Sequence, residues 1–277
     1  MATFQTSDNL TLYYEDAGAG PPVLCLAGLT RNCRDFDFVA PHMAHTRLIR
    51  MDYRGRGKSD YAPDFMSYSI LQEAQDVIEL LDHLGLPQVT LLGTSRGGLI
   101  AMVLAHLHKN RLNGVILNDI GPVVAPGGLE RIIDYVGKEP NFPTYAAAAD
   151  GLKAVYADAF PNVSLNRWLV QAEFMWREQD KDTLALRYDH RLRDALVGQA
   201  GAGDAPDLWL LFDALDGLPL ASIRGANSDL LDAETQAEMA RRHPDMITAT
   251  VPDRGHVPFL DEPGALIAIM ALLERIK

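Results

Sequence analysis

A serine between two glycines is the first feature of this sequence that could do chemistry. Gly93-Thr94-Ser95-Arg96-Gly97 follows a short apolar run over residues 89–92 and opens a helical pattern over residues 96–108. Flanking glycines permit a tight turn from strand to helix, which would leave the Ser95 hydroxyl exposed at the helix N-terminus. Ser95 is therefore a candidate nucleophile. The alternative is a glycine-rich helix start with a capping serine.

A serine hydroxyl is a weak nucleophile and needs a general base. The chain has eight histidines, and His256 is the best placed of them. It lies in a loop that follows the apolar run over residues 246–251 and precedes the last helical pattern. Loops at the carboxyl ends of strands carry the ligand-binding groups of open α/β sheets. We therefore predict that His256 is the base.

The base in turn needs an acid that fixes its tautomer and stabilises the imidazolium. Asp229 follows the strand-like run over residues 218–223, so it is expected at the same sheet edge as Ser95 and His256. Asp232 is the rival carboxylate, but it is better placed to cap a helix that begins near residue 233. The predicted set is Ser95, Asp229 and His256.

The elements that must position these residues alternate along the chain. Short apolar runs cover residues 22–26, 48–51, 89–92 and 115–117, and each ends at or near Gly, Pro or Asp, as buried parallel strands do. Helical patterns lie between them, over residues 70–84 and 96–108, and a last one runs from about Pro263 to the C-terminus. The predicted fold class is α/β, with a mostly parallel, doubly wound sheet.

The alternation stops after residue 122. Residues 123–205 contain helical patterns and no convincing strand, and residues 200–206 have the composition of a flexible join. We expect a core of residues 1–122 and 206–277 with an all-helical cap over residues 123–205. Aromatic and arginine side chains are frequent in this segment: Tyr135, Phe142, Tyr145, Tyr156, Phe160, Trp168, Phe174, Trp176, Arg167, Arg177, Arg187, Arg191 and Arg193. The aromatic residues fit either an apolar substrate pocket or ordinary helix packing.

The order serine, aspartate, histidine occurs in the α/β-hydrolase fold, and the sequence resembles that family along nearly its whole length. Residues 52–59 (DYRGRGKS) are similar to the family's Asp-x-Arg-Gly-x-Gly-x-Ser loop, and residues 255–263 (GHVPFLDEP) to its histidine loop. The resemblance implies an oxyanion hole made by the backbone N–H groups of Leu29 and Arg96. The family usually has histidine where this chain has Ala27, which removes a side chain that commonly supports the loop.

These residues predict a serine hydrolase that cleaves a carboxylic ester or related acyl bond of a small to medium substrate. The same triad could instead serve a C–C bond hydrolase, a lactonase, a lyase or a perhydrolase, and a non-catalytic ligand-binding member is a more distant alternative. Serine at the nucleophile position disfavours the related dehalogenases and epoxide hydrolases, which use a carboxylate there. The chain shows neither zinc-ligand spacing nor a dinucleotide fingerprint, so no metal and no cofactor are expected.

Composition limits the partners. The 277 residues include 25 Lys and Arg against 37 Asp and Glu, a net charge of −12. This balance disfavours nucleic acid and anionic membranes, which need a basic face. Neither a signal peptide nor an apolar segment of about 20 residues is visible. A cytoplasmic protein with a small-molecule substrate is expected.

Overall fold

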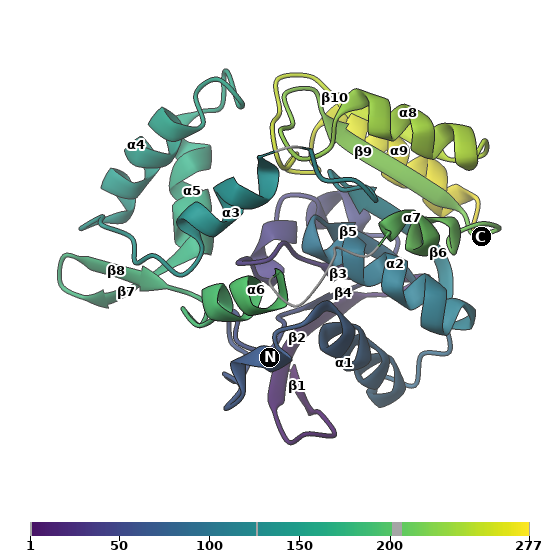
Figure 1. The fold of residues 1–277 in the computed structure, drawn as a ribbon, viewed down its shortest axis with the longest axis horizontal. Helices are drawn as coiled ribbons and strands as arrows, with labels where there is room; N and C mark the ends of the chain where they lie inside the picture. Colours follow the sequence, from purple (N-terminus) through teal and green to yellow (C-terminus); the bar gives the residue numbers. More distant parts are fainter. Residues whose placement is uncertain (1, 126, 201–206, 277) are drawn as a thin grey trace.

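The computed structural model describes residues 2–125, 127–200 and 207–276. Its centre is an eight-stranded sheet in the order β1-β2-β4-β3-β5-β6-β9-β10 (Figure 1). The pairs β1–β2 and β2–β4 are antiparallel, and the remaining neighbours are parallel. The predicted fold class is confirmed. The strands are β1 (Ala2–Gln5), β2 (Thr11–Gly18), β3 (Pro22–Leu26), β4 (Arg47–Met51), β5 (Val89–Thr94), β6 (Leu112–Asn118), β9 (Leu220–Gly225) and β10 (Ile247–Val251).

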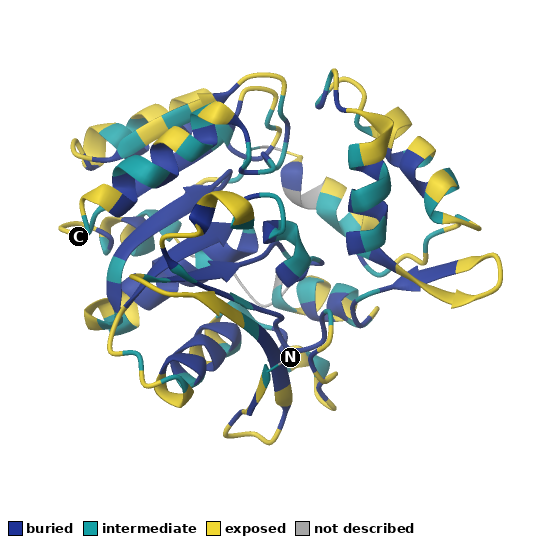
Figure 2. Cartoon of the chain, turned by 180° about the vertical axis from the view of Figure 1, so that it is seen from behind, coloured by how far each residue is buried: buried dark blue, intermediate teal, exposed yellow. Residues whose placement is uncertain are grey.

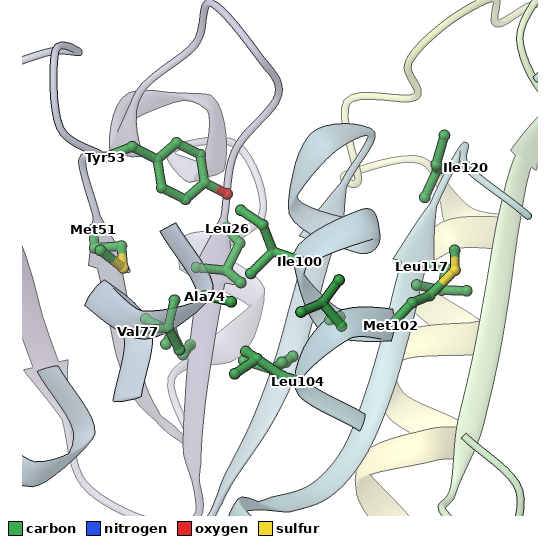
Figure 3. Packing of buried hydrophobic residues seen from close by; sticks show 14 of the residues in the cluster. Leu26, Met51, Tyr53, Ala74, Val77, Ile100, Met102, Leu104, Leu117 and Ile120 are labelled. Atoms are coloured by element: carbon green, nitrogen blue, oxygen red, sulfur yellow. The ribbon is translucent and has the colours of Figure 1, made fainter. Parts of the chain in front are cut away.

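Both faces of the central strands are buried, which explains their continuous apolar sequences. In β3, Val23 and Cys25 join the cluster that includes residues of α9 (Pro263–Glu274). Leu24 and Leu26 point to the opposite face and join the cluster that includes residues of α1 (Ile70–His83) and α2 (Arg96–His108). Figure 3 shows part of this second cluster, where side chains of both helices meet those of the strands. The two layers hold the sheet rigid, so its strand ends can fix the site.

The helices of the sheet layers are α1 (Ile70–His83), α2 (Arg96–His108), α7 (Leu208–Asp213), α8 (Ala233–Arg242) and α9. All but α7, for which no helix was predicted, lie close to their predicted positions. The Ser69 hydroxyl caps α1 by accepting a hydrogen bond from the Gln72 amide at 3.2 Å. The connections contain the 3₁₀ segments η1 (Cys33–Phe36), η2 (Ala40–Met43), η3 (Phe65–Ser67) and η4 (Lys109–Arg111).

The segment over residues 123–205 is called the insert below, and its described parts stand apart from the sheet in Figure 1. It contains α3 (Gly128–Tyr135), α4 (Tyr145–Val155), α5 (Leu165–Met175), β7 (Trp176–Asp180), β8 (Thr183–Leu186) and α6 (Leu192–Ala200). The prediction that it is all helical is wrong, because β7 and β8 form an antiparallel hairpin. The far end of that hairpin is exposed over residues 177–183 (Figure 2). Residues 201–206 of the predicted flexible join lie outside the described residues.

Backbone hydrogen bonds tie the insert to the loop after β4. The Gly57 N–H donates to the Arg187 carbonyl at 2.7 Å, and the Asp189 N–H donates to the Gly55 carbonyl at 2.8 Å. The Tyr68 hydroxyl adds a buried bond to the Asp189 carboxylate at 2.7 Å. The insert is thereby held beside the carboxyl ends of the parallel strands. No helix in the described parts of the chain is long and apolar enough to cross a bilayer.

Candidate active site

Ser95 lies at the sharp turn between β5 and α2. Its backbone angles, φ 51° and ψ −113°, are rare for a residue with a side chain. The two glycines of the motif make this turn possible. A methyl group at Gly97 would lie 2.1 Å from the Leu26 carbonyl oxygen, and one at Gly93 would lie 2.6 Å from the Gly97 backbone. The sequence therefore folds so that the Ser95 side chain stands at the strand end.

His256 reaches Ser95 from the loop between β10 and α9. Its Nε2 lies 3.0 Å from the Ser95 Oγ, and its Nδ1 lies 2.8 Å from the Asp119 Oδ2. A carboxylate only accepts hydrogen bonds, so Nδ1 carries the proton and Nε2 is left to accept from the serine hydroxyl. The Asp119 side chain is fully buried, whereas that of His256 is 20% exposed. This arrangement suits proton transfer from Ser95 to His256.

The acid beside His256 is Asp119, and the prediction that Asp229 orients the base is wrong. Asp229 is about half exposed and pairs with Arg131 at 3.2 Å on the surface. Asp119 directly follows β6, and its positive φ of 55° turns the chain there. Asp119 stands two residues after the apolar run over residues 115–117, so the strand pattern allows it as well as Asp229. Asp232 caps α8 by accepting from the Thr235 amide at 2.6 Å, as expected.

Groups at the end of β9 hold the Asp119 carboxylate in place. The Gly225 N–H donates to Oδ1 at 2.7 Å, and the Ser228 hydroxyl donates to Oδ2 at 2.6 Å. Oδ2 therefore accepts from both Ser228 and His256. The strand that was expected to supply the acid supplies its hydrogen-bond donors instead.

The loop after β3 lies beside Ser95. Gly28 and Leu29 line the same cavity as Ser95 and His256. The Tyr53 hydroxyl donates to the Ala27 carbonyl at 3.1 Å, and the Arg56 Nε donates to the Leu29 carbonyl at 3.0 Å. These two bonds support a loop that has alanine where the resembling family usually has histidine.

The family of the chain follows from comparison with known proteins. A family model described as alpha/beta hydrolase fold matches residues 21–263. The chain belongs to the α/β-hydrolase fold family. A curated relative, the 3-hydroxybutyrate-oligomer hydrolase of Cupriavidus necator, is 38% identical over 257 residues, which are 90% of this chain and 87% of the relative.

Two further relatives extend this comparison. A crystal structure of an alpha/beta hydrolase from Novosphingobium aromaticivorans shares 41% identity, covers 99% of this chain and 97% of its own, and has a TM-score of 0.93. The 2-(acetamidomethylene)succinate hydrolase of Mesorhizobium japonicum is 24% identical over 271 residues, which are 96% of this chain and 92% of that relative. Relatives of this α/β hydrolase are thus named as hydrolases.

A buried charge cluster connects the two segments predicted to form the oxyanion hole. Glu73 of α1 forms an ion pair with Arg56, whose Nη1 lies 2.7 Å from Oε1, and it accepts a hydrogen bond from the Arg96 Nε at 2.5 Å. Burial lowers the pKa of the Arg56 guanidinium. The positive charge of Arg96 lowers it further, whereas the negative charge of Glu73 opposes the shift. Arg56 contacts the Leu29 carbonyl and Arg96 follows the serine, so one carboxylate links both segments. Sequence analysis missed Glu73, because a single acidic residue in an amphipathic helix gives no signal.

A cavity of about 400 Å³ opens above Ser95 and His256 in this α/β hydrolase. Its wall is mostly apolar and aromatic, and the insert contributes most of it. Of the aromatic residues singled out in the sequence, Tyr135, Phe142, Tyr156, Phe160, Trp168 and Trp176 line the cavity. None of the five insert arginines lines it, because each bonds to protein groups elsewhere in the described chain. The arginine in the wall is Arg31, from the loop after β3.

No group of three His, Cys, Asp or Glu side chains within residues 2–125, 127–200 and 207–276 is arranged to hold a metal ion. Ser95 and His256 line the base of the cavity, and Asp119 bonds to His256 from behind it. Their chemistry is nucleophilic and acid–base.

Proposed function

We propose that this α/β hydrolase cleaves carboxylic esters through an acyl-enzyme on Ser95. The observation that carries the proposal is the hydrogen-bonded chain Ser95–His256–Asp119 at the base of an apolar cavity. A hydroxyl, an imidazole and a buried carboxylate in this order can activate an oxygen nucleophile at neutral pH.

The reaction proceeds in two halves. Ser95 Oγ attacks the ester carbonyl carbon while His256 Nε2 takes the hydroxyl proton. The imidazolium is stabilised by Asp119 and returns the proton to the leaving alcohol. Water then attacks the acyl-enzyme, again with His256 as the base, and the acid product leaves with Ser95 regenerated.

The backbone N–H groups of Leu29 and Arg96 are proposed as the oxyanion donors. Two donors aimed at the developing negative charge stabilise the tetrahedral intermediate, and loss of one such donor costs about 10²–10³-fold in kcat in comparable enzymes. Support comes from the position of Leu29 in the cavity wall and of Arg96 directly after the nucleophile.

The insert, residues 123–205, is proposed to be a cap that closes the cavity over the triad and selects the substrate. Its aromatic side chains fit a small to medium acyl group. The name of the Cupriavidus necator relative suggests a first substrate to try, namely short linear oligomers of 3-hydroxybutyrate. These are esters, as the proposed mechanism requires.

Hydrolysis of p-nitrophenyl esters from acetate to decanoate tests the proposal, with Ser95→Ala measured alongside. We expect turnover by the wild type and a loss of at least about 10³-fold in Ser95→Ala. The preferred acyl chain length would show how long an acyl group the cavity accommodates. Equal turnover by the two proteins would contradict the mechanism. Turnover of a β-diketone or a lactone without turnover of any ester would replace ester hydrolysis by C–C or lactone cleavage.

A further inference from the structure

One side of the cavity wall carries polar groups that the proposed mechanism does not use. Among them are the guanidinium of Arg31, from the loop after β3, and the hydroxyls of Tyr135 and Tyr156, from the insert; Asp35, Asp134, Lys138 and Gln171 also line the cavity. The guanidinium and the two hydroxyls are hydrogen-bond donors in a wall that is otherwise mostly apolar. Donors in such a cavity call for an acceptor, because leaving them unpaired costs free energy.

Arg31 is close to the reacting centre. A methyl group at Gly28 would lie 3.3 Å from the Arg31 Cγ and 3.9 Å from the Ser95 Cβ, so both side chains border the same small space. The Arg31 side chain is only 18% exposed. A group bound by its guanidinium would therefore belong to the molecule that reacts at Ser95.

The guanidinium is held on one edge and open on the other. Its Nε donates to the Asp35 carboxylate at 2.8 Å, and its Nη2 donates to Asp35 at 2.6 Å and to Gln171 at 2.5 Å. Its Nη1 has no hydrogen-bond partner in the described parts of the chain. The pairing with Asp35 fixes the orientation of the group and leaves one donor nitrogen to meet a ligand.

The two tyrosine hydroxyls complete the set. Neither has a hydrogen-bond partner among the residues that the structure describes. Tyr135 is 48% exposed, but the burial of its remaining surface and that of Tyr156 raises the pKa of both hydroxyls, and the charge of Arg31 partly opposes that rise. Both hydroxyls are therefore protonated at neutral pH and can donate. Tyr156 stacks on Trp168 with the ring centroids 5.8 Å apart, which restricts the direction of its hydroxyl.

We infer that Arg31, Tyr135 and Tyr156 form a subsite for a carboxylate of the substrate. The preferred substrate is then an ester that also carries a free carboxylate, as a linear oligomer of a hydroxy acid does at one end. The inference rests on the proposed ester hydrolysis and adds the substrate class to it. Asp35 balances the Arg31 charge, so recognition comes from three hydrogen bonds and less from net charge.

A matched pair of substrates tests the subsite. The pair is 4-nitrophenyl hydrogen glutarate, with a free carboxylate, and 4-nitrophenyl methyl glutarate, in which that carboxylate is a methyl ester. The corresponding succinate and adipate pairs vary the distance between the ester and the free carboxylate. We expect kcat/KM for the best acid to exceed that of its methyl ester by about 10-fold or more, the effect of one hydrogen bond to a charged group.

Variants assign the preference to residues. Arg31→Met is expected to abolish the preference, and Tyr135→Phe and Tyr156→Phe to reduce it, because kcat/KM falls further for the acid than for the methyl ester. Arg34→Met is the matched control, because Arg34 is a neighbouring arginine that bonds to the Glu173 carbonyl and does not line the cavity. It is expected to keep the full preference.

Two results would overturn the inference. One is equal kcat/KM for acid and methyl ester in the wild type. The other is an equal loss for both substrates in Arg31→Met with no change in preference in the tyrosine variants, which would make Arg31 a support of the loop. If no ester is turned over, the proposed function fails, and calorimetry then tests the subsite alone. Ser95→Ala is expected to bind glutarate at least about 10-fold more tightly than Ser95→Ala/Arg31→Met, and equal binding would refute the subsite.

Discussion

Two of the three residues in the proposed triad have backbone conformations that side chains seldom adopt. Ser95 has φ 51° and Asp119 has φ 55°, and each directly follows a buried parallel strand. Such conformations cost about 1–3 kcal/mol each and persist only where the surrounding structure imposes them. Here the neighbouring strands impose them, since the Ser95 N–H donates to the Asn118 carbonyl and the Asp119 N–H to the Ile223 carbonyl. The sheet thereby points both side chains at His256.

Exchange of the two candidate acids separates their roles. Asp119→Asn is expected to lower kcat by about 10³–10⁴-fold, because an amide cannot stabilise the imidazolium or hold its tautomer. Asp229→Asn is expected to change kcat by less than about 2-fold, because Asp229 forms a surface ion pair with exposed Arg131. Steady-state kinetics on the best p-nitrophenyl ester measures both. Full activity in Asp119→Asn together with a large loss in Asp229→Asn would restore Asp229 as the acid.

The sequence could not decide between these carboxylates. Asp119 and Asp229 both follow parallel strands, so the strand pattern places both at the same sheet edge. What distinguishes them is local: the turn at Asp119 aims its side chain inward, where Gly225 and Ser228 donate to it. Periodicity does not encode the direction of a turn. Ser95 and His256 were easier to predict, because a glycine-flanked serine and a late histidine loop are specific patterns.

At the scale of elements, α1 places two buried carboxylates one turn apart. Glu73 faces Arg56 and Arg96, which lead to the proposed oxyanion donors. Asp76 faces Arg54, which leads to Asp8 on the surface. The two carboxylates belong to one helix and have fully buried side chains, yet only Glu73 is connected to the site. The helix therefore offers an experiment with a built-in control.

Glu73→Gln is expected to lower kcat by about 10-fold with little change in KM, a fraction of the 10²–10³-fold effect of losing an oxyanion donor. The physical reason is that two arginines lose their shared anion and the segments holding Leu29 and Arg96 shift. Glu73→Asp, which keeps the charge, is expected to recover part of the kcat. Kinetics on the titrated active sites of each variant provides the measurement.

Asp76→Asn is the control for that experiment. Breaking either buried pair is expected to cost about 3–5 kcal/mol of unfolding free energy, as urea unfolding would measure. Asp76→Asn is nevertheless expected to keep kcat per folded molecule. An equal fall of kcat in Glu73→Gln and Asp76→Asn would show that loss of stability alone explains both.

Helices and strands with mostly buried residues were easier to predict from the sequence than exposed ones. The helix over residues 96–108 was predicted with its observed bounds, because it is apolar nearly all round and begins at a glycine-flanked turn. The hairpin of β7 and β8 was missed. Its first strand, WREQD, has one buried residue followed by four exposed ones, so no alternation marks it. This strand forms because it pairs with β8. A residue pattern within the strand itself does not reveal such pairing.

At the scale of the whole molecule, the cavity is shared between the sheet and the insert. Six of the eight insert aromatic residues named from the sequence line it, whereas Tyr188, which also lines it, was not among them. An arginine was expected from the insert, but the arginine in the wall, Arg31, comes from the loop after β3. Which residues line a cavity depends on how segments that are distant in the sequence pack together. The pattern of residues in a single sequence does not show this packing directly.

Whole-chain stability is expected to depend on pH through His243, at the end of α8 and away from the cavity. Its side chain is buried against Phe212, with ring centroids 4.7 Å apart. Burial lowers the pKa of the His243 imidazole from 6.5. The nearby cations Lys109 and Arg242 lower it further, whereas the carboxylates Asp216 and Asp213 oppose the shift.

The sign of the effect follows from proton linkage. Above pH 6.5 the imidazole is neutral in the folded and unfolded chain, so its stabilising contribution is fully present. As the pH falls from 6.5 through the lower folded-state pKa, the unfolded chain binds the proton more readily, and the free energy of unfolding decreases. Urea unfolding of the wild type and His243→Gln between pH 5 and 8 is expected to give a steeper loss of unfolding free energy on the acid side for the wild type.

Since His243 does not line the cavity, the two proteins are expected to share one pH profile of kcat/KM. Parallel stability curves would show that the imidazole titrates alike in both states, and a shifted activity profile would show that α8 affects the site.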